Sequence, residues 1–495
     1  MVFSSNVFLF LFLPLFLAAY YLTPNRNRLR NWVVLIGSYL FYAWWRIDFL
    51  LLFAAVTGWN YLVGMRIAAH GAGTLLARRW LMAGAGLDLA TLGYFKYANF
   101  GVASFNELLH GLGAEPLVLA HVILPIGISF YVFESISYIA DVYRGDTEAT
   151  RHPVDFATFI ALFPHLIAGP VFRYKDLASQ FEQREHSLAK FGEGSLRFMQ
   201  GFIKKVFIAD SIAPMVSQAF ALTHPTTADA WLGALAYTAQ LYFDFSGYSD
   251  MAIGLGLMMG FRFVENFNQP YISQSITEFW RRWHMSLSAW LRDYLYIALG
   301  GNRGGTAKTY RNLFLTMLLG GLWHGANWTF VLWGAWHGAI LCVERALGVK
   351  PPRERTTPAA TDMVPQTAAP AAGFRVTRWA LTFLFVVLGW VMFRAEDVGT
   401  ALRLYGAMFR FDGAGLSAVY AGSITSLQLV TLLLAGLISA ATGAHALRSA
   451  QPAAPRPPLR ARGVQLALWW VWPLFLLSIL KLSAQSYSPF LYFQF

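Results

Sequence analysis

Charged residues are scarce in this 495-residue chain. They make up 13% of the sequence, whereas a soluble globular protein carries about 25%. Hydrophobic residues reach 56%, and several apolar stretches approach the roughly 20 residues that a helix needs to cross a bilayer. This composition excludes an ordinary soluble protein. It predicts an all-α, polytopic integral membrane protein that forms a single domain over residues 1–495.

Cysteine is almost absent, because Cys342 is the one cysteine in the chain. An internal disulfide is therefore excluded, and a free cysteine in an apolar run usually packs as a small hydrophobe. The sequence also lacks GxGxxG and GxxxxGKS/T phosphate loops and CxxC and HExxH metal-binding patterns. We expect no metal site and no permanently bound cofactor, and we interpret the glycines near Gly300 and Gly304 as helix breaks.

Acidic residues are fewer than basic ones, which gives the chain a formal net charge of +12. In a soluble protein this excess would suggest a nucleic-acid partner. Here the basic residues fall mainly in short loops between apolar segments, so membrane orientation explains them better and we expect no nucleic acid. Arg26, Arg28 and Arg30 follow the first apolar run, which predicts a cytoplasmic loop and a periplasmic N-terminus. No basic residue precedes that run, so we expect a retained anchor rather than a signal peptide.

Apolar segments recur along the chain at lengths typical of membrane helices. We expect roughly a dozen spanning or re-entrant helices. The loop 99–116 carries little positive charge and is expected outside. The predicted spans cover residues 7–22, 31–45, 49–65, 80–98, 117–140, 200–220, 229–260, 376–393, 424–443 and 464–482.

Residues 152–200 interrupt this alternation of spans and loops. The apolar run 154–168 is short for a span, and Pro164, His165 and Gly169 interrupt it. Non-helical backbone at membrane depth is tolerated only where it is buried in protein or lines a wet cavity. We therefore predict a re-entrant or interfacial segment with His165 in a cavity wall, followed by a surface helix. A simple turn at the membrane surface is the alternative.

Two segments between the later spans differ from the rest in composition. Residues 347–374 are rich in proline, alanine and threonine, which is typical of a flexible loop. Residues 445–462 hold four arginines and no acidic residue, which predicts a basic cytoplasmic loop. We expect both segments to lie in the cytoplasm.

The apolar run 229–260 contains several polar side chains, which we expect to face the interior of a helix bundle. Asp244 and Asp250 are six residues apart, or about 240° around a helix. The two carboxylates therefore do not share a helical face, and a paired-carboxylate site built from them alone is disfavoured.

Residues 281–337 hold three of the eleven histidines in strongly apolar surroundings. Polar groups at membrane depth are costly and by default indicate a functional site. The segment opens with RRWHMSLSAWLRDYLYI, which contains His284. It ends with GGLWHGANWTFVLWGAWHG, which contains His324 and His337.

These two motifs resemble the membrane-bound O-acyltransferase superfamily, and the resemblance extends to about Arg394. Within the superfamily it is closest to the membrane subunits of alginate O-acetylation in Gram-negative bacteria. Four stretches that precede the motifs support it: MVFSSNVFLFLFLPLFL at the N-terminus, LPIGISFYVFESISY at 124–138, FPHLIAGPVFR at 163–173 and QLYFDFSGYSDMAIG at 240–254.

Acyl transfer to a hydroxyl needs a base, donors that stabilise the developing oxyanion, and a dry tunnel that aligns donor and acceptor. The resemblance implies helices around such a central tunnel. It also implies that the histidine of GLWHG, His324, is the catalytic histidine. A neutral imidazole suits a base near pH 7. From the residues alone, a buried His324 that only bonds a neighbouring helix is the alternative.

His284 is the second catalytic candidate, because the resemblance places another signature polar position of the family in its motif. On a continuous helix it would share one side with Trp280 and Arg281. Its role would be to orient substrate, to stabilise the oxyanion or to assist the base. Structural packing is the alternative.

Other polar residues near the motifs are weaker candidates. Arg281 and Arg282 are candidates for holding the phosphates of the donor, although anchoring at the interface is the commoner role of such arginines. His337 follows His324 by thirteen residues, about 220° around one helix, which favours a structural or supporting role. The residues expected to line the tunnel or to support the site are Trp323, Asn327, His337, His165 and Asp244.

The resemblance implies a multi-pass O-acetyltransferase of the bacterial inner membrane. Acetyl groups from a cytoplasmic donor, acetyl-CoA, would cross the membrane for esterification of an exported polysaccharide, with alginate as the first candidate. Periplasmic acetylation proteins would be partners, and the polysaccharide would be the acceptor directly or through them. Another polysaccharide, teichoic acid, a lipid or a protein stays open as acceptor. A transporter of donor or polymer and a structural scaffold stay open as functions, although the inverted repeats typical of transporters are not visible.

Overall fold

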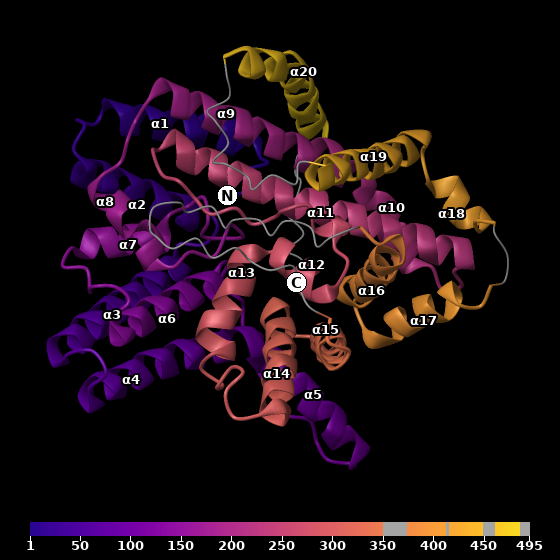
Figure 1. Cartoon of the computed structure of the whole chain (residues 1–495), viewed down its shortest axis with the longest axis horizontal. Helices are drawn as coiled ribbons and strands as arrows, with labels where there is room; N and C mark the ends of the chain where they lie inside the picture. Colours follow the sequence, from indigo (N-terminus) through magenta and orange to yellow (C-terminus); the bar gives the residue numbers. More distant parts are fainter. Residues whose placement is uncertain (350–373, 412–414, 449–460, 486–495) are drawn as a thin grey trace. The chain divides into compact units, whose positions relative to one another are not determined.

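The computed structural model describes residues 1–349, 374–411, 415–448 and 461–485. All regular structure in these ranges is helical (Figure 1), which confirms the predicted all-α class. The chain divides into two compact units. The first unit is Met1–Gly192 with Leu255–Arg262, and the second is Glu193–Gly254 with the described part of Phe263–Phe495. Most of the predicted loops 347–374 and 445–462 lies outside the described residues.

The regular structure of the first unit is helical. Its helices are η1 (Phe8–Phe12), α1 (Leu13–Leu22), α2 (Asn27–Ala43), α3 (Asp48–His70), α4 (Leu75–Leu92), η2 (Gly93–Tyr97), α5 (Ala98–Gly111), α6 (Ile128–Arg144), α7 (Pro153–Ala161) and α8 (Tyr174–Glu182).

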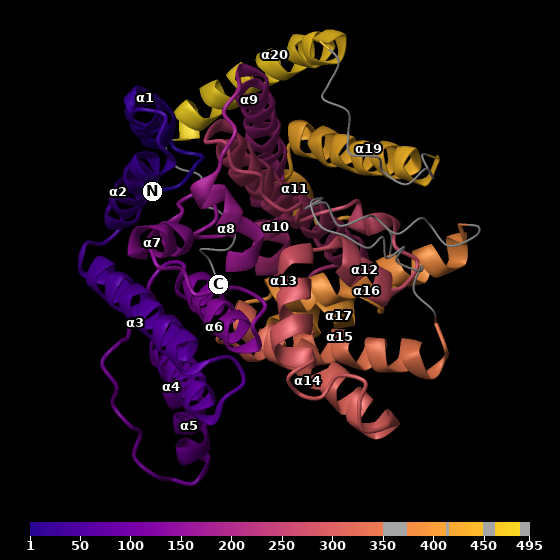
Figure 2. The ribbon, with the colours of Figure 1, turned by 60° about the vertical axis from the view of Figure 1, so that its left-hand side comes forward.

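Helix α6 packs against α3 and α4, and the three helices lie side by side in Figures 1 and 2. Glycines set the close approach. A Cβ atom added at Gly64 would overlap the ring of Tyr138, and one added at Gly84 would overlap Ile139. Small residues at helix contacts let backbones approach closely, which is a common way to pack helices in membranes.

The predicted boundaries around α5 and α6 were wrong. The expected outside loop 99–116 is largely helix α5, and the expected span 117–140 becomes helical only at Ile128. Gly127 has a left-handed backbone, with φ of 76°, and Pro125 has no N–H to donate. Side chains hold the non-helical stretch instead, since Asn106 bonds both the N–H and the C=O of Leu117.

The second unit begins within α9 and contains the predicted histidine core. Gly300 and Gly304 have positive φ angles and lie between η5 and α14, so the predicted helix break is confirmed. The helices are α9 (Leu188–Phe202), η3 (Ile203–Ala209), α10 (Asp210–Ala221), α11 (Thr227–Met258), η4 (Pro270–Ile272), α12 (Ile276–Arg282), α13 (Met285–Trp290), η5 (Leu291–Tyr296), α14 (Thr306–His324), α15 (Trp328–Ala346), α16 (Val376–Arg394), α17 (Val398–Met408), α18 (Ala418–Ser423), α19 (Ser426–Arg448) and α20 (Ala461–Gln485).

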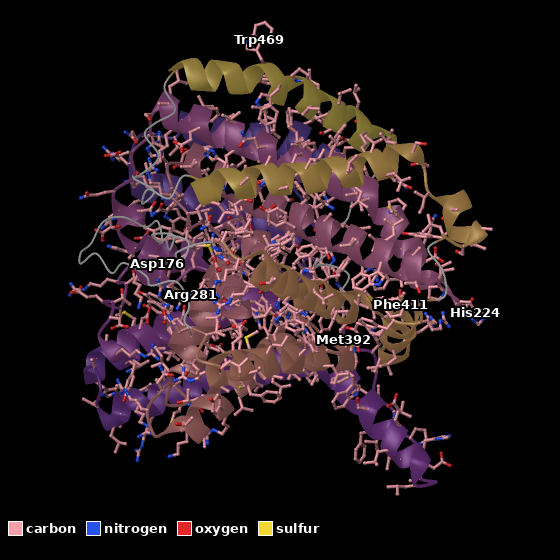
Figure 3. All side chains as sticks on the ribbon, turned by 45° about the vertical axis from the view of Figure 1, so that its right-hand side comes forward. Asp176, His224, Arg281, Met392, Phe411 and Trp469 are labelled. Carbon is pink, nitrogen blue, oxygen red and sulfur yellow. The ribbon has the colours of Figure 1, made fainter. Side chains whose placement is uncertain are left out.

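Three described helices are long and apolar enough to cross a membrane: Asp48–His70, Val376–Arg394 and Ser426–Leu447. Many helices also expose large apolar side chains. Trp469 on α20 is 82% exposed and points away from the helix in Figure 3. Exposed apolar surface of this extent fits a chain whose solvent is lipid.

Buried ion pairs link η3 and α11 inside the second unit. Lys205 Nζ lies 2.7 Å from Asp244 Oδ1 and 2.6 Å from Asp210 Oδ1. Asp250 pairs instead with Arg197 and Lys204. The two aspartates thus contact different cations, as expected for carboxylates on different helical faces, and the structure places Asp244 in this ion pair.

Replacing Lys205 with methionine should destabilise the protein strongly. The substitution leaves the Asp244 carboxylate buried without its cation, and breaking a buried pair in this way costs about 3–5 kcal/mol. Thermal unfolding in detergent would measure the loss. The matched control is Lys204→Met, because Asp250 keeps Arg197 as a partner. Equal unfolding temperatures for the two variants would contradict the prediction.

Candidate active site

The two histidines predicted to be catalytic lie next to each other. His284 precedes α13 and His324 ends α14, and their ring centroids are 6.5 Å apart. Both side chains are buried. Forty residues of chain separate them, so the meeting of the rings depends on how these helices pack.

The backbone at His284 differs from the helix assumed for it. Helix α12 ends at Arg282, and His284 adopts the left-handed conformation with φ of 44° and ψ of 53°. The expected side-by-side arrangement with Trp280 and Arg281 on one helix is therefore wrong. A left-handed conformation costs a non-glycine residue about 1–2 kcal/mol. Strained backbone of this kind clusters at functional sites.

Asn266 fixes the orientation of the His284 ring. Its side-chain oxygen lies 3.2 Å from His284 Nδ1, and it accepts hydrogen bonds from the Ser286 hydroxyl and the Ser286 backbone N–H. A backbone N–H only donates, so the asparagine atom that meets it is the oxygen. His284 Nδ1 therefore donates its proton to the same oxygen.

The other ring nitrogen of His284 is left as an acceptor. In a neutral imidazole, a proton on Nδ1 leaves a lone pair on Nε2. His284 Nε2 is buried and has no hydrogen-bond partner among the described residues. Buried polar atoms are normally paired, so this atom is suited to a substrate group that donates a hydrogen bond.

His324 lies at a sharp end of helix α14. The next residue, Gly325, has an extended backbone, so the helix ends at the histidine. Aromatic rings enclose the imidazole, with centroids of Trp323, Trp333 and Phe393 at 5.0, 5.1 and 5.2 Å. The His324 ring therefore lies in largely aromatic surroundings.

Two glycines let α14 and α15 approach closely beside His324. A Cβ atom at Gly321 would overlap the Phe330 carbonyl, and one at Gly334 would overlap the Met317 carbonyl. Gly321 of the GGLWHG motif therefore serves the packing of α14 against α15. The position of His324 follows from this contact between α14 and α15.

The ring of His337 contacts that of Trp333, which also contacts His324. Its ring centroid is 5.0 Å from that of Trp333 and 5.3 Å from that of Trp280. Neither ring nitrogen has a hydrogen-bond partner among the described residues. A supporting role for His337 at the site stays a prediction, and Trp333 is a ring that both His324 and His337 contact.

The remaining candidates near the pair have other contacts. Arg282 Nε lies 2.9 Å from Glu278 Oε1, and its guanidinium also bonds the Asn268 carbonyl. Arg281, labelled in Figure 3, is exposed. Asn327 caps α15 by accepting from the Thr329 N–H. Phosphate binding by the two arginines stays a prediction.

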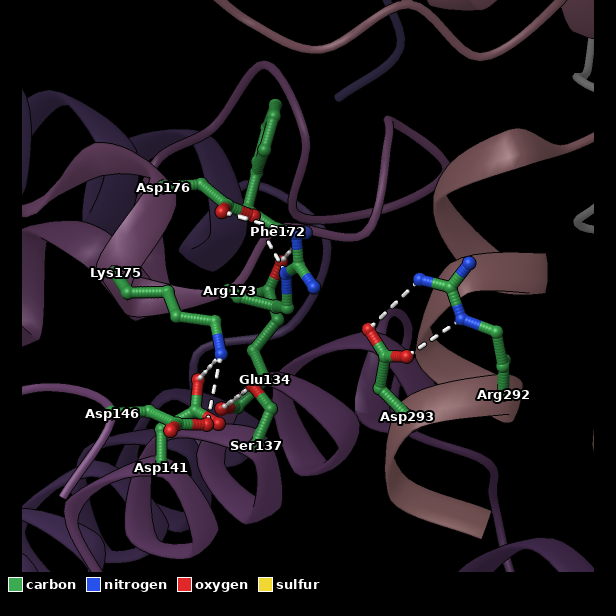
Figure 4. Close-up of polar contacts among 10 residues, drawn as sticks. All are labelled: Glu134, Ser137, Asp141, Asp146, Phe172, Arg173, Lys175, Asp176, Arg292 and Asp293. Atoms are coloured by element: carbon green, nitrogen blue, oxygen red, sulfur yellow. Dashed lines mark hydrogen bonds and ion pairs between the residues drawn. The ribbon is translucent and has the colours of Figure 1, made fainter. Parts of the chain in front are cut away.

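His165 belongs to the first unit and has a carboxylate partner that the sequence analysis missed. Its Nδ1 lies 2.9 Å from Glu134 Oε1, and both side chains are fully buried. The predicted interruption of the apolar run 154–168 is present, because α7 ends at Ala161 and turns follow. The re-entrant or interfacial placement and the cavity wall at His165 stay predictions. Figure 4 shows Glu134 on α6, whose carboxylate also accepts from the Phe172 N–H.

Glu134 and Asn266 are the two polar residues that sequence reasoning overlooked. Glu134 lies inside the quoted stretch LPIGISFYVFESISY, where an acidic residue in an apolar run was a usable signal. Asn266, in VENFNQP, gave no periodic or spacing signal. Among the described residues, no three His, Cys, Asp or Glu side chains are arranged to hold a metal ion.

Comparison with known proteins identifies the family. The model of the membrane-bound O-acyltransferase family matches residues 147–349, which include both site histidines. A Pseudomonas putida protein named "probable alginate O-acetylase AlgI" is 62% identical over the full length of both chains. The chain belongs to the membrane-bound O-acyltransferase family. It is therefore a membrane protein and an acyltransferase.

Two further relatives show the breadth of this family. A protein of the same name from Azotobacter vinelandii is 62% identical over the full length of both chains. A Helicobacter pylori peptidoglycan O-acetyltransferase is 36% identical over 84% of this chain and 81% of its own. This membrane-bound O-acyltransferase thus resembles relatives that are named for different polymers.

Proposed function

We propose that this membrane-bound O-acyltransferase supplies acetyl groups for O-acetylation of an exported polysaccharide, with alginate as the first candidate. The observation that supports this most is the adjacent pair His284 and His324, with ring centroids 6.5 Å apart in a buried aromatic setting. The names of the relatives with 62% identity supply the polymer. Acetyl-CoA in the cytoplasm is the proposed donor.

His324 acts as the general base in this proposal. It removes the proton from the acceptor hydroxyl while the hydroxyl oxygen bonds to the acetyl carbonyl carbon. The carbon–sulfur bond of the thioester then breaks, and the imidazolium returns the proton to the leaving thiolate. Each proton and bond is accounted for, and His324 ends the cycle neutral.

His284 positions the acceptor. Because Asn266 holds the proton on Nδ1, the Nε2 atom accepts a hydrogen bond from a neighbouring hydroxyl of the same acceptor. Holding the acceptor at two points places its reactive oxygen near the thioester, which is a large source of rate enhancement.

The proposed orientation in the membrane is based on the positions of the basic loops. The inner membrane is the proposed location, with the N-terminus in the periplasm because Arg26, Arg28 and Arg30 follow the first helix. Periplasmic acetylation proteins are the proposed partners that complete transfer to the polymer. Peptidoglycan is the second candidate acceptor, since the Helicobacter pylori relative is named for it.

Deletion of the gene tests the proposed function. We expect the deletion strain to secrete its polysaccharide without acetyl esters, and the intact gene to restore them. Ester content of purified polymer and of purified peptidoglycan would be measured side by side. Loss of esters from peptidoglycan alone would make peptidoglycan the acceptor in place of the exported polysaccharide. Unchanged esters on both polymers would refute the proposal.

A further inference from the structure

Arg184 is a buried cation that has no acidic partner among the described residues. It lies in the connection between α8 and α9 of the first unit and is 9% exposed. No carboxylate comes within 4 Å of its guanidinium among the described residues, and none of its three nitrogens makes a hydrogen bond of normal geometry there. The Tyr20 hydroxyl interacts with it, and its carbon Cζ lies 4.3 Å from the ring centroid of Phe261.

More positive charge gathers around the same place. Arg30, in the first turn of α2, is buried, and its Cζ atom lies 5.2 Å from the ring centroid of Tyr20. Its guanidinium bonds only neutral oxygens, those of Asn25 and Thr23, among the described residues. Lys190 Nζ donates to the Gly260 carbonyl beside Phe261. Arg184, Arg30 and Lys190 form a cluster that we call the basic cluster.

His186 lies among these three cations, and their positive charge affects its pKa. Burial, together with the charges of Arg30, Arg184 and Lys190, lowers the pKa of His186 to about 4. Asp155 is an acid that influences Arg184, but its contribution is the smallest of those acting on that arginine, and its Oδ1 accepts from Asn31. The local field is therefore strongly positive.

An uncompensated buried cation is costly. Moving a charge out of water costs several kcal/mol even after the protein relaxes, and like charges nearby add to the cost. Proteins normally pair such a group with an anion. A planar guanidinium donates two parallel hydrogen bonds to the oxygens of a phosphate, which makes arginine the usual residue at phosphate sites.

We propose that the basic cluster binds a phosphate group. Arg184 supplies the buried guanidinium, and Arg30 and Lys190 supply the neighbouring positive charge. The phosphate comes either from the head group of an anionic membrane lipid or from the nucleotide end of a coenzyme A donor. The lipid source is independent of the proposed function, whereas the coenzyme A source rests on it.

By contrast, other cations of the first unit already have carboxylates. Lys175 Nζ reaches Asp141 at 3.2 Å and Asp146 at 3.3 Å, as Figure 4 shows. Arg173 pairs with Asp176 at 2.9 Å. Arg184 differs from these two cations, because no carboxylate of the described residues lies within 4 Å of its guanidinium.

Equilibrium binding to the purified full-length protein tests the site. The two probes are coenzyme A and phosphatidylglycerol in detergent micelles at constant ionic strength, with diacylglycerol as the lipid without phosphate. We expect wild-type protein to bind at least one phosphate probe, and Arg184→Gln to weaken that binding at least tenfold. Arg184→Lys should lose part of the affinity, because lysine keeps the positive charge but lacks the planar guanidinium that donates two parallel hydrogen bonds.

Arg26→Gln is the matched control, because Arg26 is exposed and lies four residues before Arg30. It should bind the probe as wild type does. Should Arg184→Gln not yield folded protein, Arg30→Gln serves as the second variant with the same expectation. Binding of coenzyme A alone identifies the donor as the source of the phosphate, and binding of phosphatidylglycerol alone identifies the lipid.

The proposal is overturned if neither probe binds the wild-type protein, or if the affinity for the probe is equal in the wild-type and Arg184→Gln proteins. Because binding is measured in place of acetylation, its failure is separate from failure of the proposed function. A variant that loses acetylation in cells but binds the probe normally would bear on the proposed function at the histidine pair and would leave the phosphate site unaffected.

Discussion

Cells carrying His324→Ala should secrete polymer that lacks acetyl esters. The substitution removes the proposed base, and the loss of a positioned general base typically costs 10²- to 10⁴-fold in rate. Polymer export itself should continue. The measurement is ester content per sugar in purified polymer, with the membrane abundance of the variant determined in the same cells.

The matched control for this prediction is His224→Ala. His224, labelled in Figure 3, is exposed and lies far along the chain from the site motifs. It should leave ester content unchanged. Normal acetylation in His324→Ala cells would refute the base assignment and transfer it to His284, or support the scaffold function. Loss of polymer export would instead favour a transporter.

The second large effect is expected at His284 and its partner. His284→Ala should lower acetylation about 100-fold, because it removes the acceptor atom that positions the substrate. Asn266→Leu should lower it by a smaller factor, since the imidazole remains but nothing holds its proton on Nδ1. Acetyl transfer by membranes from these cells, normalised to variant abundance, would measure both.

Asn266→Asp separates positioning from packing. An aspartate oxygen also accepts the Nδ1 proton of His284 and the hydrogen bonds of Ser286, so this variant should keep most of the activity that Asn266→Leu loses. Ser249, which Asn266 Nδ2 contacts at 3.2 Å, provides a control through Ser249→Ala, for which we expect a small effect. Equal losses in Asn266→Asp and Asn266→Leu at equal abundance would contradict the positioning role.

Hydrophobicity and local backbone chemistry could be interpreted from the sequence. The shortage of charge predicted an all-α membrane protein, because only helices and closed barrels satisfy the backbone in lipid. The glycines near Gly300 and Gly304 predicted the break before α14. Hydropathy misplaces the start of α6, because the stretch before Ile128 is apolar, whereas Pro125 and Gly127 give it a non-helical backbone.

The sequence by itself determined the class of the protein, its family and the two histidines worth testing. Only the tertiary structure decided that His284 and His324 are neighbours, that Asn266 holds the His284 proton, and that no carboxylate of the described part of the chain lies beside Arg184. These are contacts between residues that are distant along the chain. Local propensity and periodicity describe single helices, whereas such contacts depend on how helices pack against one another.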